Sequence, residues 1–232
     1  MSWNGGVFFM TNSDTSEVLV VKSSEVEVIK SQKSIGLQSQ QRRTLNVRRM
    51  TVIAVLSSIS IMLSMVPGIG YIPIGPTNAT IMHVPVIIGA IVEGPVVGMS
   101  VGFIFGVTSM IRALTMPTIT SFAFINPLVS IIPRVLIGIV AYYVYQLVVK
   151  LTKSVCLSGW LSGLIGSLVN TLGVLGMIYF LYGERYAQAM GENATAAKTL
   201  ILTIATTNGI PEAVVGGFLV SAVAGVLKKR KK

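Results

Sequence analysis

Charged residues are scarce in this chain, and their scarcity excludes most classes of soluble protein. Of its 232 residues, 11% are Asp, Glu, Lys or Arg, and 52% are hydrophobic. Soluble domains carry about 25% charged residues. Several apolar runs approach 20 residues and are flanked by charge, which suits a bilayer core roughly 30 Å thick. The sequence therefore indicates an all-α domain embedded in a membrane.

Cysteine and histidine are also rare, with one residue of each. The single Cys156 excludes an internal disulfide, and there is no Cys/His cluster to hold zinc. The chain lacks the Gly-x-x-x-x-Gly-Lys-[Ser/Thr] loop of ATPases, the His-Glu-x-x-His motif and the Gly-x-Ser-x-Gly nucleophile elbow. We therefore expect a binding protein rather than an enzyme, with no catalytic residue, metal site or cofactor.

The net charge of +10 does not indicate nucleic-acid binding, because of where the basic residues lie. They cluster beside the apolar runs, where they orient a membrane protein. The cytoplasmic flanks would hold Arg42, Arg43, Arg48, Arg49, Lys150, Lys153 and the basic tail at 228–232, whereas the outer loops would hold only Arg112, Arg185 and Lys198. Both chain ends are therefore predicted to be cytoplasmic.

We predict six membrane spans in residues 42–232. They cover 50–66, about 79–92, 95–114, about 122–149, roughly 157–182 and about 199–227. The second span is short and is interrupted by Pro85. Residues 1–41 do not resemble a cleaved signal and are predicted to be a flexible cytoplasmic extension, in which 17–21 and 25–29 could each form a short strand. Met10 is a second possible start of the chain.

The first outer loop, 67–78, is rich in Gly and Pro and carries bulky apolar residues. Gly and Pro favour tight turns. Because a fully solvated loop would not need Ile69, Tyr71, Ile72 and Ile74, we expect the loop to fold back as a lid, the alternative being a plain connector.

Polar groups within or beside membrane spans are candidates for a binding site, because burying them is costly. The candidate residues are Arg112, Asn78, His83, Asn126, Arg134, Asn170, Asn208 and Glu212. Arg112 is the best candidate to hold an anionic group, because a guanidinium can bind a carboxylate through two hydrogen bonds. Structural alternatives remain: Arg134 and Glu212 could form a buried ion pair, His83 could be an interior histidine, and the Asn residues could join helices.

Two sets of small residues recur every fourth position and so mark helix faces that permit close approach. Gly98, Gly102 and Gly106 lie in the third span, and Ala54 and Ser58 lie in the first. These faces could pack within the domain or dock a separate membrane subunit.

Three runs together resemble the substrate-binding S components of energy-coupling factor (ECF) vitamin transporters. They are ATIMHVPVIIGA at 79–90, GPVVG at 94–98, and Asn126-Pro127 followed by Pro133-Arg134. The resemblance covers about residues 44–228 and is closest to the branch of pantothenate, riboflavin and folate binders.

The resemblance implies six helices around a vitamin pocket at the outer face, capped by the first outer loop, in a bacterial plasma membrane. It also implies partners, namely a transmembrane coupling protein and two ATPases. Members carry an Ala-x-x-x-Ala docking motif, to which Ala54 and Ser58 correspond with one serine. Pantothenate is the expected vitamin, because the HVPVII run at 83–88 and the Asn126 to Arg134 run look closest to that subgroup, and only 7% of residues are aromatic. Riboflavin or folate binding, with Phe122, Phe124, Tyr179 and Tyr182 around a flavin, and a self-sufficient small carrier are the alternatives.

Overall fold

The computed structural model describes residues 2–4, 7–11, 18–22, 47–66, 70–74, 77–118, 121–191, 193 and 197–230. The chain divides into two compact units, Met1–Arg48 and Arg49–Lys232. The first unit contains an antiparallel sheet in the order β1-β2-β3, formed by Ser2–Asn4, Val7–Thr11 and Val18–Lys22. The strand considered at 17–21 thus matches β3, while 25–29 lies outside the described residues. The flexibility of residues 1–41 and the boundary at residue 42 stay predictions.

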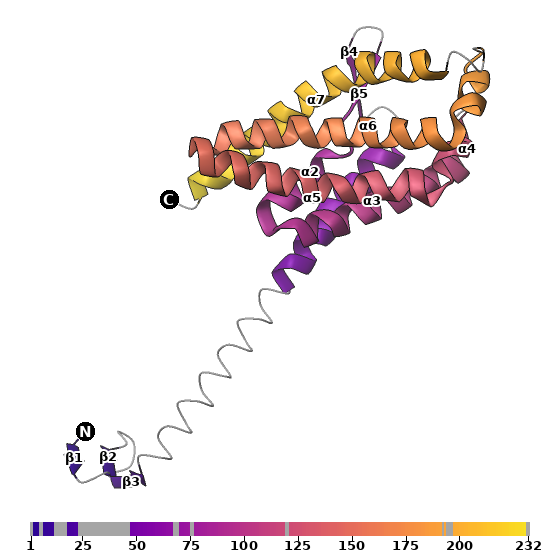
Figure 1. Ribbon diagram of the computed structural model, residues 1–232. Coiled ribbons are helices and arrows are strands. Elements are labelled where there is room, and N and C mark those ends of the chain that lie inside the picture. The colour runs from indigo at the N-terminus through magenta and orange to yellow at the C-terminus, as the bar shows by residue number, and fades with distance from the viewer. Residues whose placement is uncertain are drawn as a thin grey trace. The chain divides into compact units, whose positions relative to one another are not determined.

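The second unit is a bundle of apolar helices (Figure 1). They are Val47–Met65, α2 (Val84–Glu93), α3 (Pro95–Thr115), α4 (Ser121–Phe124), α5 (Pro127–Thr152), α6 (Val155–Ala189) and α7 (Ala197–Arg230). Within the described residues, five helices are long and apolar enough to cross a membrane, and α2 is a shorter apolar helix. The predicted helical membrane fold is confirmed.

The second span differs from its prediction at both its start and its proline. Helix α2 begins at Val84 rather than near residue 79, and Pro85 lies in its first turn instead of interrupting it. Proline is well placed there, because the first amides of a helix have no partner within the helix. Ten residues of helix extend about 15 Å, roughly half the hydrocarbon core.

Extended backbone precedes α2 in the chain. Strands β4 (Tyr71–Ile74) and β5 (Thr77–Thr80) pair as an antiparallel hairpin, where the sequence predicted a loop with tight turns over 67–78. Strand β5 packs against α7 (Figure 1).

The fourth and fifth predicted spans also differ from the structure. The fourth is split, because α4 stops at Phe124 and α5 begins after Asn126, whose Oδ1 accepts a hydrogen bond from the Leu128 amide at 2.9 Å. The fifth continues through its predicted end at Tyr182, where the backbone leaves helical values (φ −141°, ψ 16°), and runs on to Ala189. Much of the outer loop expected between the fifth and sixth spans, 183–198, is therefore helix.

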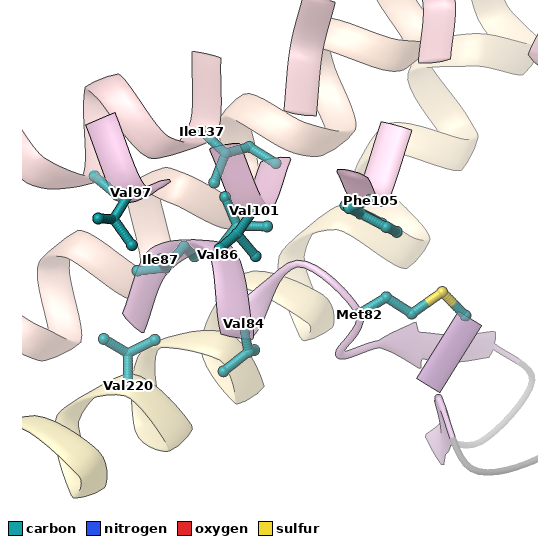
Figure 2. Close-up of a cluster of buried hydrophobic side chains, with 10 residues drawn as sticks. Met82, Val84, Val86, Ile87, Val97, Val101, Phe105, Ile137 and Val220 are labelled. Atoms are coloured by element: carbon teal, nitrogen blue, oxygen red, sulfur yellow. The ribbon is translucent and has the colours of Figure 1, made fainter. Parts of the chain in front are cut away.

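Helix α2 forms the centre of the bundle, in contact with α3, α5, α6 and α7. Figure 2 shows its Val86 and Ile87 beside Val97 and Val101 of α3, with Val220 of α7 on the opposite side. Val86 and Ile87 are fully buried. The surrounding helices therefore hold α2, and with it the turn that carries His83, in a fixed position.

The glycine face of α3 packs within the protein. A Cβ at Gly106 would lie 2.7 Å from the Ser130 carbonyl oxygen, and one at Gly98 would lie 3.0 Å from Cα of Gly138. Gly102 likewise meets the α5 backbone. Of the two alternatives that the sequence left open for these glycines, the structure shows packing within the domain, against α5.

Helices α6 and α7 approach each other in the same way. A Cβ at Gly163 would lie 2.7 Å from the Gly216 carbonyl oxygen and 2.8 Å from Cα of Gly217. This close contact brings Asn170 of α6 and Glu212 of α7 near each other and leads directly to the site.

Candidate ligand-binding site

A cavity of about 360 Å³ lies among α3, α5, α6, α7 and the end of β5. Sites for small molecules measure about 300–1,000 Å³. Five of the residues predicted to bind a ligand line this cavity: Arg112, Arg134, Asn170, Asn208 and Glu212. The fold therefore gathers polar groups from four helices that are far apart in sequence.

Arg134 is held by three contacts, one of which follows from the proline before it. Pro133 has no amide hydrogen, so the Val129 carbonyl, four residues earlier, lacks its usual helical donor. The Nη1 group of Arg134 donates to that carbonyl instead, at 2.7 Å. The guanidinium lies 5.6 Å from the ring centroid of Phe105 and 5.7 Å from that of Phe124.

One nitrogen of Arg134 is left without a hydrogen bond. The residue is 6% exposed and lines the cavity, yet its Nε has no partner among the described residues. Buried donors are normally paired. The same holds for Oδ1 of Asn170. A donor and an acceptor on the cavity wall are thus available to a bound molecule.

Glu212 contacts three residues of two other segments. Its Oε1 accepts hydrogen bonds from Oγ1 of Thr80 at 2.5 Å and from Nδ2 of Asn170 at 3.4 Å, and lies 3.2 Å from Nδ1 of His83. Glu212 and Arg134 do not form the direct ion pair that the sequence left open. Each makes its own contacts with other residues, although both line the same cavity.

His83 lies behind Glu212 rather than on the cavity wall. It is fully buried, and its Nε2 lies 2.6 Å from Oγ of Ser167. A Cβ at Gly216 would crowd both side chains of this contact. His83 is therefore an interior histidine joined to the site through a carboxyl group.

The two remaining candidates do not contribute a described side chain to the cavity. Asn126 caps α5 and donates from Nδ2 to the Tyr182 hydroxyl at 3.0 Å, so it fixes the α4–α5 break against the α6 bend. Its role as a binding residue stays a prediction, although its side chain is not among those that line the cavity. The backbone of Asn78 pairs with Pro73 in the hairpin, but its side chain lies outside the described part of the chain.

Sequence reasoning missed most of the hydroxyl and apolar groups of the cavity. These include Ser64, Thr80, Met82, Phe105, Ser109, Thr118, Ser121 and Thr171. Serine and threonine are common in membrane helices, where they can bond to their own backbone, so residue type alone does not indicate a site. Phe124, considered only for a flavin, also lines the cavity.

A second hollow, about 700 Å³, lies where α6 bends and α7 begins. It is lined by Tyr179 to Arg185, Ala197 and Lys198, and Arg185 lies 4.4 Å from the ring centroid of Phe122. Several of its side chains are exposed, and the buried polar groups converge elsewhere. The smaller cavity is therefore the better candidate site.

Residues 48–224 match the family profile described as "ECF transporter, substrate-specific component". The chain belongs to this family. The resemblance drawn from residues 44–228 is confirmed, and this S component is a multi-pass protein of the cell membrane.

Similar proteins include two pantothenate transporters. The pantothenic acid transporter PanT of Lactococcus lactis subsp. cremoris (strain MG1363) is 28% identical over 170 residues, covering 67% of this chain and 81% of the relative. The pantothenate transporter PanT of Leuconostoc mesenteroides subsp. mesenteroides is 28% identical over 172 residues, covering 70% and 83%. A solved S component of a bacterial ECF transporter aligns with a TM-score of 0.48 and 18% identity, over 80% of this chain and 95% of that chain.

Proposed function

We propose that this S component binds pantothenate in the cavity between α3, α5, α6 and α7 and delivers it to an ATP-driven importer. The observation that carries the proposal is the meeting of two arginines, two amides and one carboxyl group in a single cavity. The two similar proteins named above are both pantothenate transporters, which supports the choice of this vitamin.

The polar groups of the cavity match those of pantothenate. The vitamin has a carboxylate, an amide and two hydroxyls. A guanidinium binds a carboxylate through parallel hydrogen bonds, which suits Arg112 or Arg134. Asn170, Asn208 and Glu212 offer amide and carboxyl partners for the other end.

The aromatic groups of the cavity favour a vitamin without a large ring system. Its phenyl side chains, Phe105 and Phe124, both face the guanidinium of Arg134. Of the aromatics considered for a flavin, Phe122 packs edge-on against Tyr182, and Tyr179 lines the outer hollow. A flavin sandwich would require these contacts to break.

The partners would be a transmembrane coupling protein and two ATPases, since this chain has no ATP-binding loop. Ala54 and Ser58 support a docking face on the Val47–Met65 helix, because both are exposed there. With both chain ends in the cytoplasm, the cavity would open toward the outside, and the β4–β5 hairpin would be its lid.

Calorimetry of the purified protein with pantothenate, riboflavin and folate tests the proposal. We expect binding of pantothenate alone, and Arg112→Ala should weaken it more than tenfold, because a charge-assisted pair contributes about 1.5–3 kcal/mol. Thr207→Val is the matched control, since Thr207 is exposed and bonds to its own helix at the Thr203 carbonyl. Tight riboflavin or folate binding would reject the choice of vitamin. Equal pantothenate binding by Arg112→Ala would remove that residue from the site.

A further inference from the structure

Arg134 is a buried cation that has no anionic partner within the described part of the chain. It is 6% exposed, lies in the long apolar helix α5 and makes no ion pair with a described residue. Its one hydrogen bond there runs from Nη1 to the Val129 carbonyl. The carboxyl group of Glu212 lines the same cavity, but its contacts are with other residues. Because a buried charge without a pair is costly, the cavity wall at Arg134 suits a ligand that brings a negative charge.

Two nitrogens of Arg134 form an edge that can bind such a ligand. Nε is buried and makes no hydrogen bond with a described residue. Nη2 makes none with the described residues either, and it is not fully buried. Since Arg134 lines the cavity, an anion can approach the edge at Nη2. A carboxylate bound side-on would place its second oxygen beside Nε, which then gains a hydrogen-bond partner.

Pro133 determines which edge of the guanidinium is left for a ligand. Proline has no amide hydrogen, so the Val129 carbonyl one turn earlier can accept a hydrogen bond from Nη1, at 2.7 Å. With any other residue at position 133, the backbone amide would be the helical donor to that carbonyl, and Nη1 would lose its partner. The carbonyl therefore holds Nη1 and leaves the remaining edge, Nε and Nη2, for the cavity.

The surrounding packing keeps Pro133 and the guanidinium in place. Pro133 is fully buried and is not one of the residues that line the cavity. A Cβ at Gly173 would lie 3.0 Å from Cβ of Pro133, so α6 packs closely on the proline. The ring centroids of Phe105 and Phe124 lie 5.6 and 5.7 Å from Cζ of Arg134, and the two rings limit its movement. Pro133 can therefore act on a ligand only through Arg134.

We propose that Pro133 is a positioning residue that makes the cavity selective for a free carboxylate. By freeing the Val129 carbonyl, it fixes Arg134 so that the Nε–Nη2 edge binds the carboxylate of the ligand through two parallel hydrogen bonds. Forms of the vitamin in which the carboxylate is reduced to an alcohol or joined in an amide are then poor ligands. This inference rests on the proposed function for its choice of vitamin.

Pantothenol, in which a hydroxymethyl group replaces the carboxylate, tests this selectivity. Calorimetry of the wild-type protein should show a preference for pantothenate of about tenfold or more, as expected for hydrogen bonds between charged groups. Pro133→Ala returns the backbone donor to the Val129 carbonyl and releases Nη1. The preference should then fall about threefold or more, while the affinity for pantothenol changes by less than about twofold. Arg134→Gln, which removes the charge, should lower the preference further.

The melting temperature and a second proline separate positioning from damage to the fold. Pro133→Ala gains a helical hydrogen bond and keeps the Cβ that α6 contacts, so its melting temperature should not fall. Pro127→Ala is the matched control, because Pro127 is the first residue of α5, where the missing amide hydrogen has no helical role. Its preference should stay at the wild-type value. Equal weakening of both ligands by Pro133→Ala, or an unchanged preference, would overturn the positioning role.

Nitrogen NMR of the arginine side chains tests the anchor without relying on the choice of vitamin. The Nε–H signal of Arg134 is identified by its loss in Arg134→Lys. Rotation about the Nε–Cζ bond should be slower in the wild type than in Pro133→Ala, because Nη1 is held. Adding pantothenate, or propionate as a small carboxylate, should shift the signal. A signal that neither carboxylate moves would overturn the proposal.

The results distinguish failure of this inference from failure of the proposed function. If pantothenate binds but pantothenol binds equally well, this inference fails while the proposed function stands. If pantothenate does not bind, the proposed function fails, and the response of the Arg134 signal to propionate and to Pro133→Ala still decides this inference.

Discussion

At the scale of single residues, Pro133 explains the position of Arg134. The proline leaves the Val129 carbonyl without a backbone donor, and the next side chain supplies one at 2.7 Å. The sequence alone indicates that a proline within a span leaves a carbonyl in need of a partner, and at Pro133 the hydrogen bond from Arg134 supplies one. It did not predict the partner, because that depends on a side-chain rotamer selected by Phe105 and Phe124.

Arg134→Lys tests this arrangement, because lysine keeps the charge but not the planar fork. The carbonyl would lose its donor, which costs about 1–3 kcal/mol for a buried group. We expect a lower melting temperature and at least tenfold weaker pantothenate binding. Arg185→Lys, outside the cavity, is the control.

A second substitution isolates the carbonyl. Pro133→Ala restores an amide donor to Val129, so Arg134→Lys should cost less stability in that background than in the wild type. Equal losses in the two backgrounds would show that the carbonyl contact is unimportant. Thermal unfolding in detergent measures all four proteins.

At the scale of helices, close backbone contact positions the site. The Gly106 face of α3 meets α5 just beside Ser130, one turn before Arg134. Gly106→Val would place side-chain carbons closer to the α5 backbone than van der Waals contact allows. We expect the two helices to separate, with a melting temperature several degrees lower, since overpacking costs about 1–3 kcal/mol.

Gly176→Ala on α6 is the matched control, because no atom lies within 4 Å of the added Cβ. It should leave the melting temperature unchanged or raise it slightly, as alanine favours a helix over glycine. An unchanged melting temperature for Gly106→Val would contradict the close packing of α3 on α5.

The start of helix α2 shows what the hydropathy pattern of the sequence could predict and what it could not. The apolar run at 79–92 was predicted as the second span, and it contains the apolar helix α2, but hydropathy could not distinguish β5 from helix. Strand and helix have the same apolar content over such short runs. The hairpin partner and the packing of β5 on α7 decided between them.

At the scale of the whole molecule, the Val47–Met65 helix differs from the other long helices. Its most apolar window is 17% buried, against 33–44% in the others. Ala54 and Ser58 lie on its exposed surface, and the hydroxyl of Ser58 bonds to the Ala54 carbonyl at 2.8 Å. This surface remains our predicted docking face for the coupling protein.

Vitamin uptake by proteoliposomes tests docking. With the coupling protein and ATPases present, Ala54→Leu and Ser58→Leu should each reduce ATP-driven pantothenate uptake several-fold, because larger side chains prevent close approach. Pantothenate binding by the isolated variants should be unchanged. Val55→Leu, exposed on the same helix but not a small residue, is the control. Uptake by the wild-type chain alone would instead indicate a self-sufficient carrier.

The sequence by itself determined that this is a membrane protein, where its spans approximately lie and which few polar residues are candidates for the binding site. The reason is that a bilayer penalises every charge and every unpaired backbone group. Only the tertiary structure decided which of those residues meet. Arg134 and Glu212 line one cavity without pairing, His83 stands behind Glu212, and Asn126 became a helix cap. These outcomes depend on contacts between residues as distant as Thr80 and Glu212, and such contacts exist only once the helices have packed.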